Sequence, residues 1–354
     1  MCLPQIMSVK LANVIQAVIP PLRLSRKTLV AVLFAIGYAL FVVFFPWEEI
    51  SKAGFSDFGN YVDFFNSADT QELSAIEFHQ LSTLTEYFTH EVLWFELVRW
   101  LTSMTGEAAI ALRIISFFIL LVWGLFLFKR ASYGVALLFL FNPGAIDIAM
   151  SGIRNGLAWS LVIVGLSVQS KAVRAALFLT GLFIHSSTLA LLAIYYFTEL
   201  AIWVIKGKKT LLASGLAIGI SMGLILTVGS ELVLGAIGDR RLGENYMVGG
   251  GSLLQASLWG ILLYLQGTSG RDYVRQNIFI IAVLAWYQTM NPFIPWSYRI
   301  WGSLLPVIAI SVMDLPARKH KIFLYLYSAY LVAQYLYWTK LFDYWYPALT
   351  GAPL

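Results

Sequence analysis

Long apolar runs separated by short polar stretches follow one another along almost the whole chain. A helix needs about 20 apolar residues to cross the hydrocarbon core of a bilayer, and the pattern predicts eleven crossings. They fall at 28–46, 108–128, 132–150, 154–170, 174–185, 187–205, 210–228, 251–267, 277–290, 297–314 and 322–340. The stretch 174–205 has three interpretations: two short helices meeting near His185, a re-entrant pair, or one long tilted helix.

Two of the intervening polar stretches are long enough to hold structure of their own. The first, 47–107, contains 11 of the 19 acidic residues. Within it, apolar residues recur at helical spacing from 87 to 104, which predicts an amphipathic helix lying along the outer membrane interface. The second, 229–250, is rich in glycine. We expect both to lie on the outer face of the membrane.

The overall composition agrees with a membrane protein. Of the 354 residues, 59% are apolar and 12% are charged, with a mean hydropathy of +0.75, whereas soluble domains carry roughly 25% charged residues. This excludes a water-soluble globular enzyme, and the single cysteine, Cys2, excludes an intramolecular disulfide. Without an internal repeat or an appended soluble domain, residues 1–354 are predicted to form one all-α, polytopic membrane domain.

The basic residues indicate how this domain is oriented. Cytoplasmic loops collect Lys and Arg, and with a cytoplasmic N-terminus 16 of the 24 basic residues fall in inside segments. That distribution requires two crossings within 174–205, so it favours eleven crossings and a C-terminus outside. The net charge of +5 therefore reflects topology and gives no indication of nucleic-acid binding.

Four arginines depart from this bias and lie at or near the outer ends of predicted helices: Arg154, Arg240, Arg241 and Arg299. An arginine at membrane depth is costly unless it is paired or hydrated, and its planar fork suits phosphate. Several arginines on one face indicate an anionic ligand there. The alternative is that each pairs with an acidic neighbour, but near Arg154 the sequence offers only Asp147, and near Arg299 none.

His185 lies at a predicted helix break and is followed by two serines. A histidine in an apolar stretch is most often a buried, hydrogen-bonded residue, yet at such a break it is also a candidate general base. The four histidines lack metal-ligand spacing, and no nucleotide-binding or nicotinamide-binding motif is present. We therefore expect neither a metal site nor a cofactor.

Five short elements occur in an order that resembles the EpsG/Wzy family of bacterial polysaccharide polymerases, which make O-antigen, capsule and exopolysaccharide. The elements are an Asp-then-Tyr segment at 56–65, a Glu-containing helix start at 90–97, an Ile-Arg-Asn segment at 152–158, a His-x-Ser segment at 183–187 and a Tyr-Arg pair in 297–299. Two positions differ from the family pattern: Val92 stands where Pro is usual, and Asn155 where Gln is usual.

The resemblance implies a multi-spanning enzyme of the bacterial inner membrane, with an all-helical fold similar to GT-C glycosyltransferases. Its substrates would be undecaprenyl-diphosphate-linked oligosaccharide repeat units, joined on the outer face without a metal. A flippase and a chain-length regulator would be its protein partners.

For such a transfer, one group of residues is expected to bind the diphosphate and the glycan: Arg154, Arg299, Arg240, Arg241, Tyr61 and Tyr298. The base that takes the acceptor proton is expected to be His185, Asp57 or Glu91, in falling order of preference. The rival function is a transporter or flippase for a lipid-linked or anionic substrate. Transport predicts broken helices in both halves of the chain, and the sequence indicates one, at 142–144. A ligase-like transferase using the same lipid carrier would need the same groups.

Overall fold

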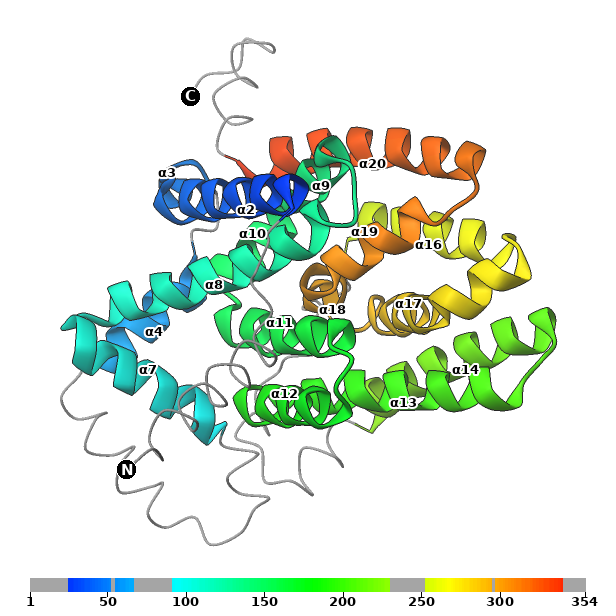
Figure 1. Ribbon diagram of the computed structural model, residues 1–354, viewed down its shortest axis with the longest axis horizontal. Helices are drawn as coiled ribbons and strands as arrows, with labels where there is room; N and C mark the ends of the chain where they lie inside the picture. Colours follow the sequence, from blue (N-terminus) through cyan, green and yellow to red (C-terminus); the bar gives the residue numbers. More distant parts are fainter. Residues whose placement is uncertain (1–24, 52–54, 67–90, 230–251, 295–296, 340–354) are drawn as a thin grey trace, which may run out of the picture.

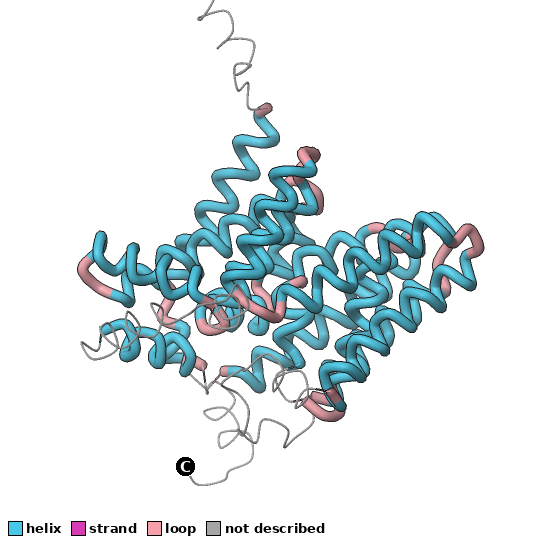
Figure 2. Tube along the Cα trace, turned by 90° about the horizontal axis from the view of Figure 1, so that it is seen from below, coloured by secondary structure: helices cyan, strands magenta, loops and turns pink. Residues whose placement is uncertain are grey.

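The computed structural model describes residues 25–51, 55–66, 91–229, 252–294 and 297–339 (Figure 1). Within these ranges the regular structure is helical throughout, apart from an isolated antiparallel bridge between Ser51 and Thr339. Figure 2 shows the helices packed side by side and joined by short turns. The all-α expectation is therefore confirmed for the described residues.

Every predicted crossing corresponds to one helix or to two consecutive helices. They are α2 (Arg26–Phe44), α8 (Ala108–Phe128), α9 (Tyr133–Leu140), α10 (Pro143–Met150), α11 (Ile153–Ser167), α12 (Lys171–Ile184), α13 (Thr188–Val204), α14 (Lys208–Val228), α16 (Leu253–Gly267), α17 (Arg271–Met290), α18 (Tyr298–Ser303), α19 (Leu305–Met313) and α20 (Ala317–Trp338). The stretch 174–205 forms two helices, and His185 caps the end of α12.

Three of these helices, α2, α8 and α14, are long and apolar enough to cross a membrane, and the bent pair α9–α10 makes a fourth if it counts as one span. The described residues thus fit an all-α membrane protein with three or four candidate spans rather than the predicted eleven. The reason is length and charge. At 1.5 Å per residue, the 15-residue helices α11 and α16 reach only about 22 Å, and α17 begins with charged residues.

The predicted break at 142–144 is present as a 62° bend between α9 and α10. A break inside a membrane is tolerated when the freed backbone groups find partners. Here the Tyr38 hydroxyl donates to the Leu140 carbonyl at 2.7 Å, and the Tyr335 hydroxyl donates to the Phe141 carbonyl at 2.5 Å. The Asn142 side chain caps the start of α10. A second predicted span, 297–314, is also interrupted, at Leu304, which the sequence did not indicate.

The stretch 47–107 contains α3 (Trp47–Ile50), α4 (Ser56–Asn66) and α7 (Val92–Thr105). The predicted amphipathic helix is confirmed as α7, although residues 87–90 of the prediction lie outside the described residues. Its apolar face does not simply lie on the interface: Trp94 and Val98 are fully buried, and α7 packs against α4, α8 and α12. The second predicted outer loop lies almost entirely outside the described residues.

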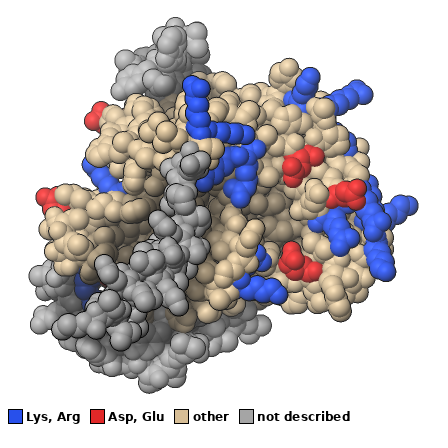
Figure 3. All heavy atoms as spheres, viewed as in Figure 1, with Lys and Arg blue, Asp and Glu red and all other residues tan. Residues whose placement is uncertain are grey.

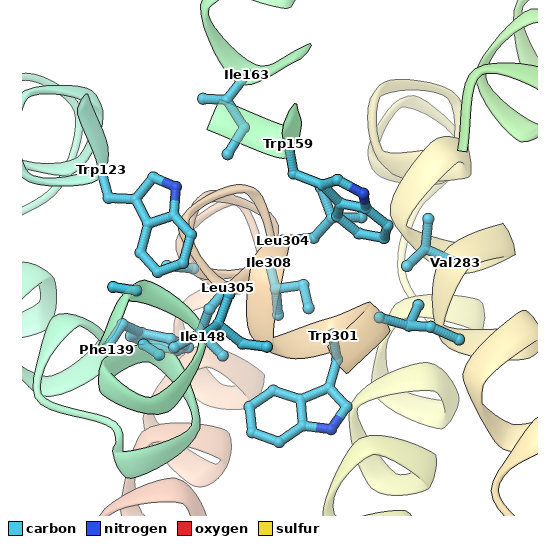
Figure 4. Packing of buried hydrophobic residues seen from close by; sticks show 14 of the residues in the cluster. Trp123, Phe139, Ile148, Trp159, Ile163, Val283, Trp301, Leu304, Leu305 and Ile308 are labelled. Carbon is cyan, nitrogen blue, oxygen red and sulfur yellow. The ribbon is translucent and has the colours of Figure 1, made fainter. Parts of the chain in front are cut away.

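The interior is packed around large aromatic side chains. Figure 4 shows Trp123 from α8, Trp159 from α11 and Trp301 from α18 directed into one apolar core. Their indole N–H groups are buried and have no hydrogen-bond partner within the described ranges. The helices α8, α10, α11, α18 and α19 therefore form the centre on which the other helices pack.

The closest helix contact is between α14 and α17. Along α14, Gly215, Gly219 and Gly223 are buried where the backbone of α17 passes. A Cβ atom on Gly219 would lie 2.1 Å from the carbonyl oxygen of Ala282. Small residues allow this approach, as they commonly do between membrane helices.

The turns that carry many of the basic residues lie away from α4 and α7 (Figure 1). Arg130 donates to Ser167 at the end of α11, and Lys319 donates to Thr268 and Ser269 in the turn between α16 and α17. In Figure 3, Lys and Arg side chains gather on the side where Figure 1 shows α13 meeting α14 and α16 meeting α17. The opposite ends of α11 and α12 hold the predicted site residues, one helix length away.

Candidate functional site

Three predicted site residues meet around one carboxylate. Nδ1 of His185 lies 2.5 Å from Oε1 of Glu91, and Oε2 of Glu91 forms an ion pair with Arg154. The N–H and hydroxyl of Ser186 donate to the same Oε1, at 3.2 and 3.4 Å. Glu91 precedes α7, Arg154 lies in the first turn of α11, and His185 ends α12, so three helix termini bring these groups together.

Glu91 is held in an unusual position. It is 5% exposed and has a φ of 53°, and it is the one non-glycine residue with positive φ in the part of the chain that the structure describes. Left-handed backbone costs energy for a residue with a side chain, and such positions cluster at functional sites. Because a buried charge must be paired, the carboxylate is fixed by its contacts to Arg154, His185 and Ser186.

Tyr61 extends this group. Its hydroxyl accepts a hydrogen bond from Nε of Arg154 at 2.6 Å, and the guanidinium carbon lies 5.3 Å from the ring centroid, within cation–π range. Burial raises the pKa of the Tyr61 hydroxyl, while the Arg154 cation acts in the opposite direction. Tyr61 therefore remains a neutral hydroxyl at physiological pH and fixes the orientation of Arg154.

Asp57 lies one helical turn before Tyr61 on α4, so the two side chains share a face of that helix. Oδ2 of Asp57 accepts a hydrogen bond from Nη2 of Arg299 at 2.7 Å. Nε of Arg299 is buried and lacks a hydrogen-bond partner among the described residues. One face of α4 thus contacts both arginines, Arg154 through Tyr61 and Arg299 through Asp57.

Asn155, which the sequence did not single out as a site residue, connects these parts. Its Nδ2 donates to Oγ of Ser303 at 2.8 Å and to the carbonyl of Arg299 at 3.4 Å. Its Oδ1 accepts from Oγ of Ser187 at 3.2 Å. Its sequence signals were its place directly after Arg154 and the Gln that the EpsG/Wzy pattern usually has at this position. Asn155 joins α11, α18 and the turn between α12 and α13.

The arginines pair with other acidic residues than the one that the sequence offered as the alternative to a ligand. Arg154 pairs with Glu91 rather than with Asp147, and Arg299 has an acidic partner although none lies near it in sequence. Asp147 instead accepts a hydrogen bond from the Tyr298 hydroxyl at 3.2 Å. The two predicted arginines Arg240 and Arg241 lie outside the described residues.

The charges of this cluster nearly cancel. Three carboxylates, from Glu91, Asp57 and Asp147, accompany the guanidinium groups of Arg154 and Arg299. The expectation of several unpaired arginines facing an anion therefore does not describe this arrangement. An anionic ligand has to replace a carboxylate or recruit further cations.

The geometry suits proton transfer at His185. When Nδ1 carries the hydrogen shared with Glu91, Nε2 is the nitrogen that can accept a proton, and the carboxylate stabilises the imidazolium that forms. Within the described ranges, no three His, Cys, Asp or Glu side chains are grouped as a metal site would require. The arrangement can therefore combine a histidine base with fixed cations.

Comparison of the chain with protein-family models, with curated proteins and with solved structures finds no match.

Proposed function

We propose that the protein is a membrane glycosyltransferase that polymerises undecaprenyl-diphosphate-linked oligosaccharide repeat units. The observation that carries this proposal is the single carboxylate of Glu91 shared by His185 and Arg154. All five sequence elements that resemble EpsG/Wzy polymerases contribute a residue to these ion pairs. Glu91 contacts Arg154 and His185, and Asp57 contacts Arg299.

In this reaction the hydroxyl of the acceptor sugar attacks the anomeric carbon of the donor. The new C–O bond forms as the bond to the diphosphate breaks, and the diphosphate leaves with the electron pair. The hydroxyl proton passes to Nε2 of His185, a contribution of roughly 100- to 10,000-fold in rate. The guanidinium groups of Arg154 and Arg299 are fixed cations near the site where negative charge develops.

The contacts also change the expected roles of the carboxylates. Glu91 and Asp57, both considered as bases from the sequence, each accept hydrogen bonds from an arginine. These contacts already engage both carboxylates, whereas the contact of His185 with Glu91 uses Nδ1 of the imidazole. His185 is therefore our choice for the base, and Glu91 positions it. Tyr298, bound to Asp147, is assigned to the wall of the same site.

The proposal includes a membrane arrangement. The site would face the outer side of a bacterial inner membrane, with the basic turns on the cytoplasmic side. Helices too short to span by themselves, such as α11 and α12, would cross only as members of a packed bundle. The separation of the site from the basic turns by the length of α11 and α12 supports this orientation.

A transporter for a lipid-linked or anionic substrate is the second candidate. One observation favours it. Two predicted spans are interrupted, and α10, which follows the first break, packs against α18, which precedes the second. Paired broken helices are typical of transporters. A ligase-like transferase would share the chemistry described above and differ in its acceptor.

The test is the lipid-linked glycan profile of a strain from which the gene is deleted. It is complemented with wild type, His185→Gln, or Arg318→Gln at equal membrane levels, the last removing an exposed arginine at the far end of the molecule. We expect single repeats in the deletion strain, a ladder with wild type and Arg318→Gln, and single repeats with His185→Gln.

Accessibility of the accumulated repeats separates the two candidates. Single repeats that a membrane-impermeant glycosidase can reach on the outer face support the polymerase. Repeats trapped on the cytoplasmic face support a flippase. Long chains in the deletion strain would overturn both.

A further inference from the structure

The two arginine–carboxylate pairs of the site differ in burial. The side chains of Arg154 and Glu91 are 20% and 6% exposed, whereas those of Arg299 and Asp57 are 40% and 30% exposed. An exposed pair contributes little to stability, while separating a buried pair leaves an uncompensated charge. Of the two pairs, only Arg299–Asp57 can exchange its carboxylate for another anion at low cost.

The hydrogen bonds of the two guanidinium groups also distinguish Arg154, which is held tightly, from Arg299, which can exchange its partner. Arg154 uses Nη1 for Glu91 and Nε for Tyr61, and the Tyr61 ring covers it at cation–π distance. Arg299 uses Nη2 for Asp57, and its Nε is buried without a partner among the described residues. A buried donor without an acceptor is unfavourable. The present pairing therefore leaves Arg299 incompletely satisfied, and an anion that draws the guanidinium outward relieves this.

The backbone of Arg299 is held by a hydrogen bond from the protein core, whereas the ion pair of its side chain with Asp57 is partly exposed. Its carbonyl accepts a hydrogen bond from Asn155, and the neighbouring Ser303 is bound by the same amide. Asp57, by contrast, lies near the start of the short helix α4, which is attached to the core at α7 and α8. An exchange of partners at Arg299 thus requires movement of one long side chain and of one partly exposed carboxylate.

We infer that Arg299 is the residue that binds the phosphate oxygens of an anionic ligand, and that Asp57 is an internal counter-ion which the ligand displaces. Arg154 remains paired with Glu91 and acts as a positioning residue for the His185–Glu91 contact. The guanidinium fork of Arg299 matches two phosphate oxygens. This inference rests on the proposed function and assigns the diphosphate of its substrate to one arginine.

The test is a binding measurement on the purified full-length protein in detergent, by titration calorimetry. The probes are farnesyl diphosphate, farnesol as the same chain without charge, and inorganic pyrophosphate. We expect Arg299→Gln to weaken farnesyl diphosphate binding by at least about 10-fold, as loss of a charge-assisted contact does. Asp57→Asn should tighten it by up to about 5-fold, because the competing carboxylate is removed.

A further variant serves as the control. Arg318→Gln, which removes an exposed arginine far from the site, is expected to bind within twofold of wild type. Unchanged binding in Arg299→Gln, or weakened binding in Asp57→Asn, would overturn the inference. Asp57→Asn keeps the test decisive should Arg299→Gln fail to fold. Equal affinity for pyrophosphate and farnesyl diphosphate would assign the site to a free anion rather than to a lipid headgroup.

The glycan profile of the same variants distinguishes this inference from the polymerase proposal. If binding depends on Arg299 but the Arg299→Gln strain still makes a normal ladder, the anion site is supported and the polymerase proposal is overturned. If the ladder is lost in that strain while binding is unchanged, the polymerase proposal is supported and the anion site is overturned.

Discussion

The contact between α14 and α17 and the polar cluster around Glu91 are held together in opposite ways. In the first, glycines without side chains allow the two helices to approach closely. A Cβ atom added to Gly219 would lie only 2.1 Å from a backbone oxygen of α17. In the second, each charged group is fixed by several others, from helices far apart in the chain. The first region should be sensitive to added atoms and the second to removed charges, and stability measurements on both can test this.

The largest effect is expected from Glu91→Ala. It leaves the Arg154 guanidinium without its carboxylate in a largely buried position, and breaking a buried pair costs about 3–5 kcal/mol. Chemical denaturation of the protein in detergent measures this. In the double variant Glu91→Ala with Arg154→Met the unpaired charge is gone, so part of the loss should be recovered. A double variant less stable than Glu91→Ala would show that the pair is not the origin of the effect.

The next effect is expected from Gly219→Ala. The added methyl group would meet the Ala282 carbonyl and, at 2.9 Å, the backbone nitrogen of Trp286, neither of which can move independently of α17. Overpacking of this kind costs about 1–3 kcal/mol. Gly37→Ala on α2 is the matched control, because nothing lies within 4 Å of its Cβ position. Equal melting temperatures for the two variants would contradict the close packing.

A smaller effect is expected from Asn155→Leu, which keeps the volume and removes three hydrogen bonds. Ser303 and Ser187 lose their partner inside the site, and an unsatisfied buried group costs about 1–3 kcal/mol. Under the proposed function, the glycan ladder of a strain complemented with Asn155→Leu should be largely lost even where the variant stays folded, because the carbonyl of Arg299 is released as well. Asn155→Gln retains an amide and should restore part of the activity. Full activity in Asn155→Leu would exclude a positioning role.

The smallest effect on stability is expected from Asp57→Asn. The Asp57–Arg299 pair is partly exposed, and such pairs contribute about 0–1 kcal/mol. The midpoint of denaturation should therefore stay close to wild type while ligand affinity changes. A loss comparable to that of Glu91→Ala would mean that both pairs are structural.

Local features of the structure followed from the sequence. The predicted helix 108–128 coincides with α8, the Asn-Pro pair marks the bend before α10, and His185 ends a helix. These features depend on neighbours a few residues apart, through apolar periodicity and the missing N–H of proline. The same information placed Arg154, His185 and Arg299 at or near predicted helix ends, but it predicted no helix over Asp57 and Tyr61 and gave none of the contacts.

The two arginine–carboxylate ion pairs could not be predicted from the sequence, because their partners lie far apart in the chain. Glu91 and Arg154 are 63 positions apart, and Asp57 and Arg299 are 242 apart, so only the packing of α4, α7, α11 and α18 brings them together. The number of crossings was overestimated because apolar composition is shared by spanning helices and by helices buried in a protein core. Roles assigned to Arg240 and Arg241 stay predictions.

The buried indole groups have a practical consequence. Trp94 is fully buried, its N–H has no hydrogen-bond partner within the described ranges, and its ring lies edge-on to Tyr61 with centroids 5.5 Å apart. An indole in such apolar surroundings emits at short wavelength, and a shift of α4 changes the environment of Trp94. The intrinsic fluorescence of this tryptophan, isolated by comparison with Trp94→Phe, therefore offers a label-free optical signal for ligand-induced movement beside the site.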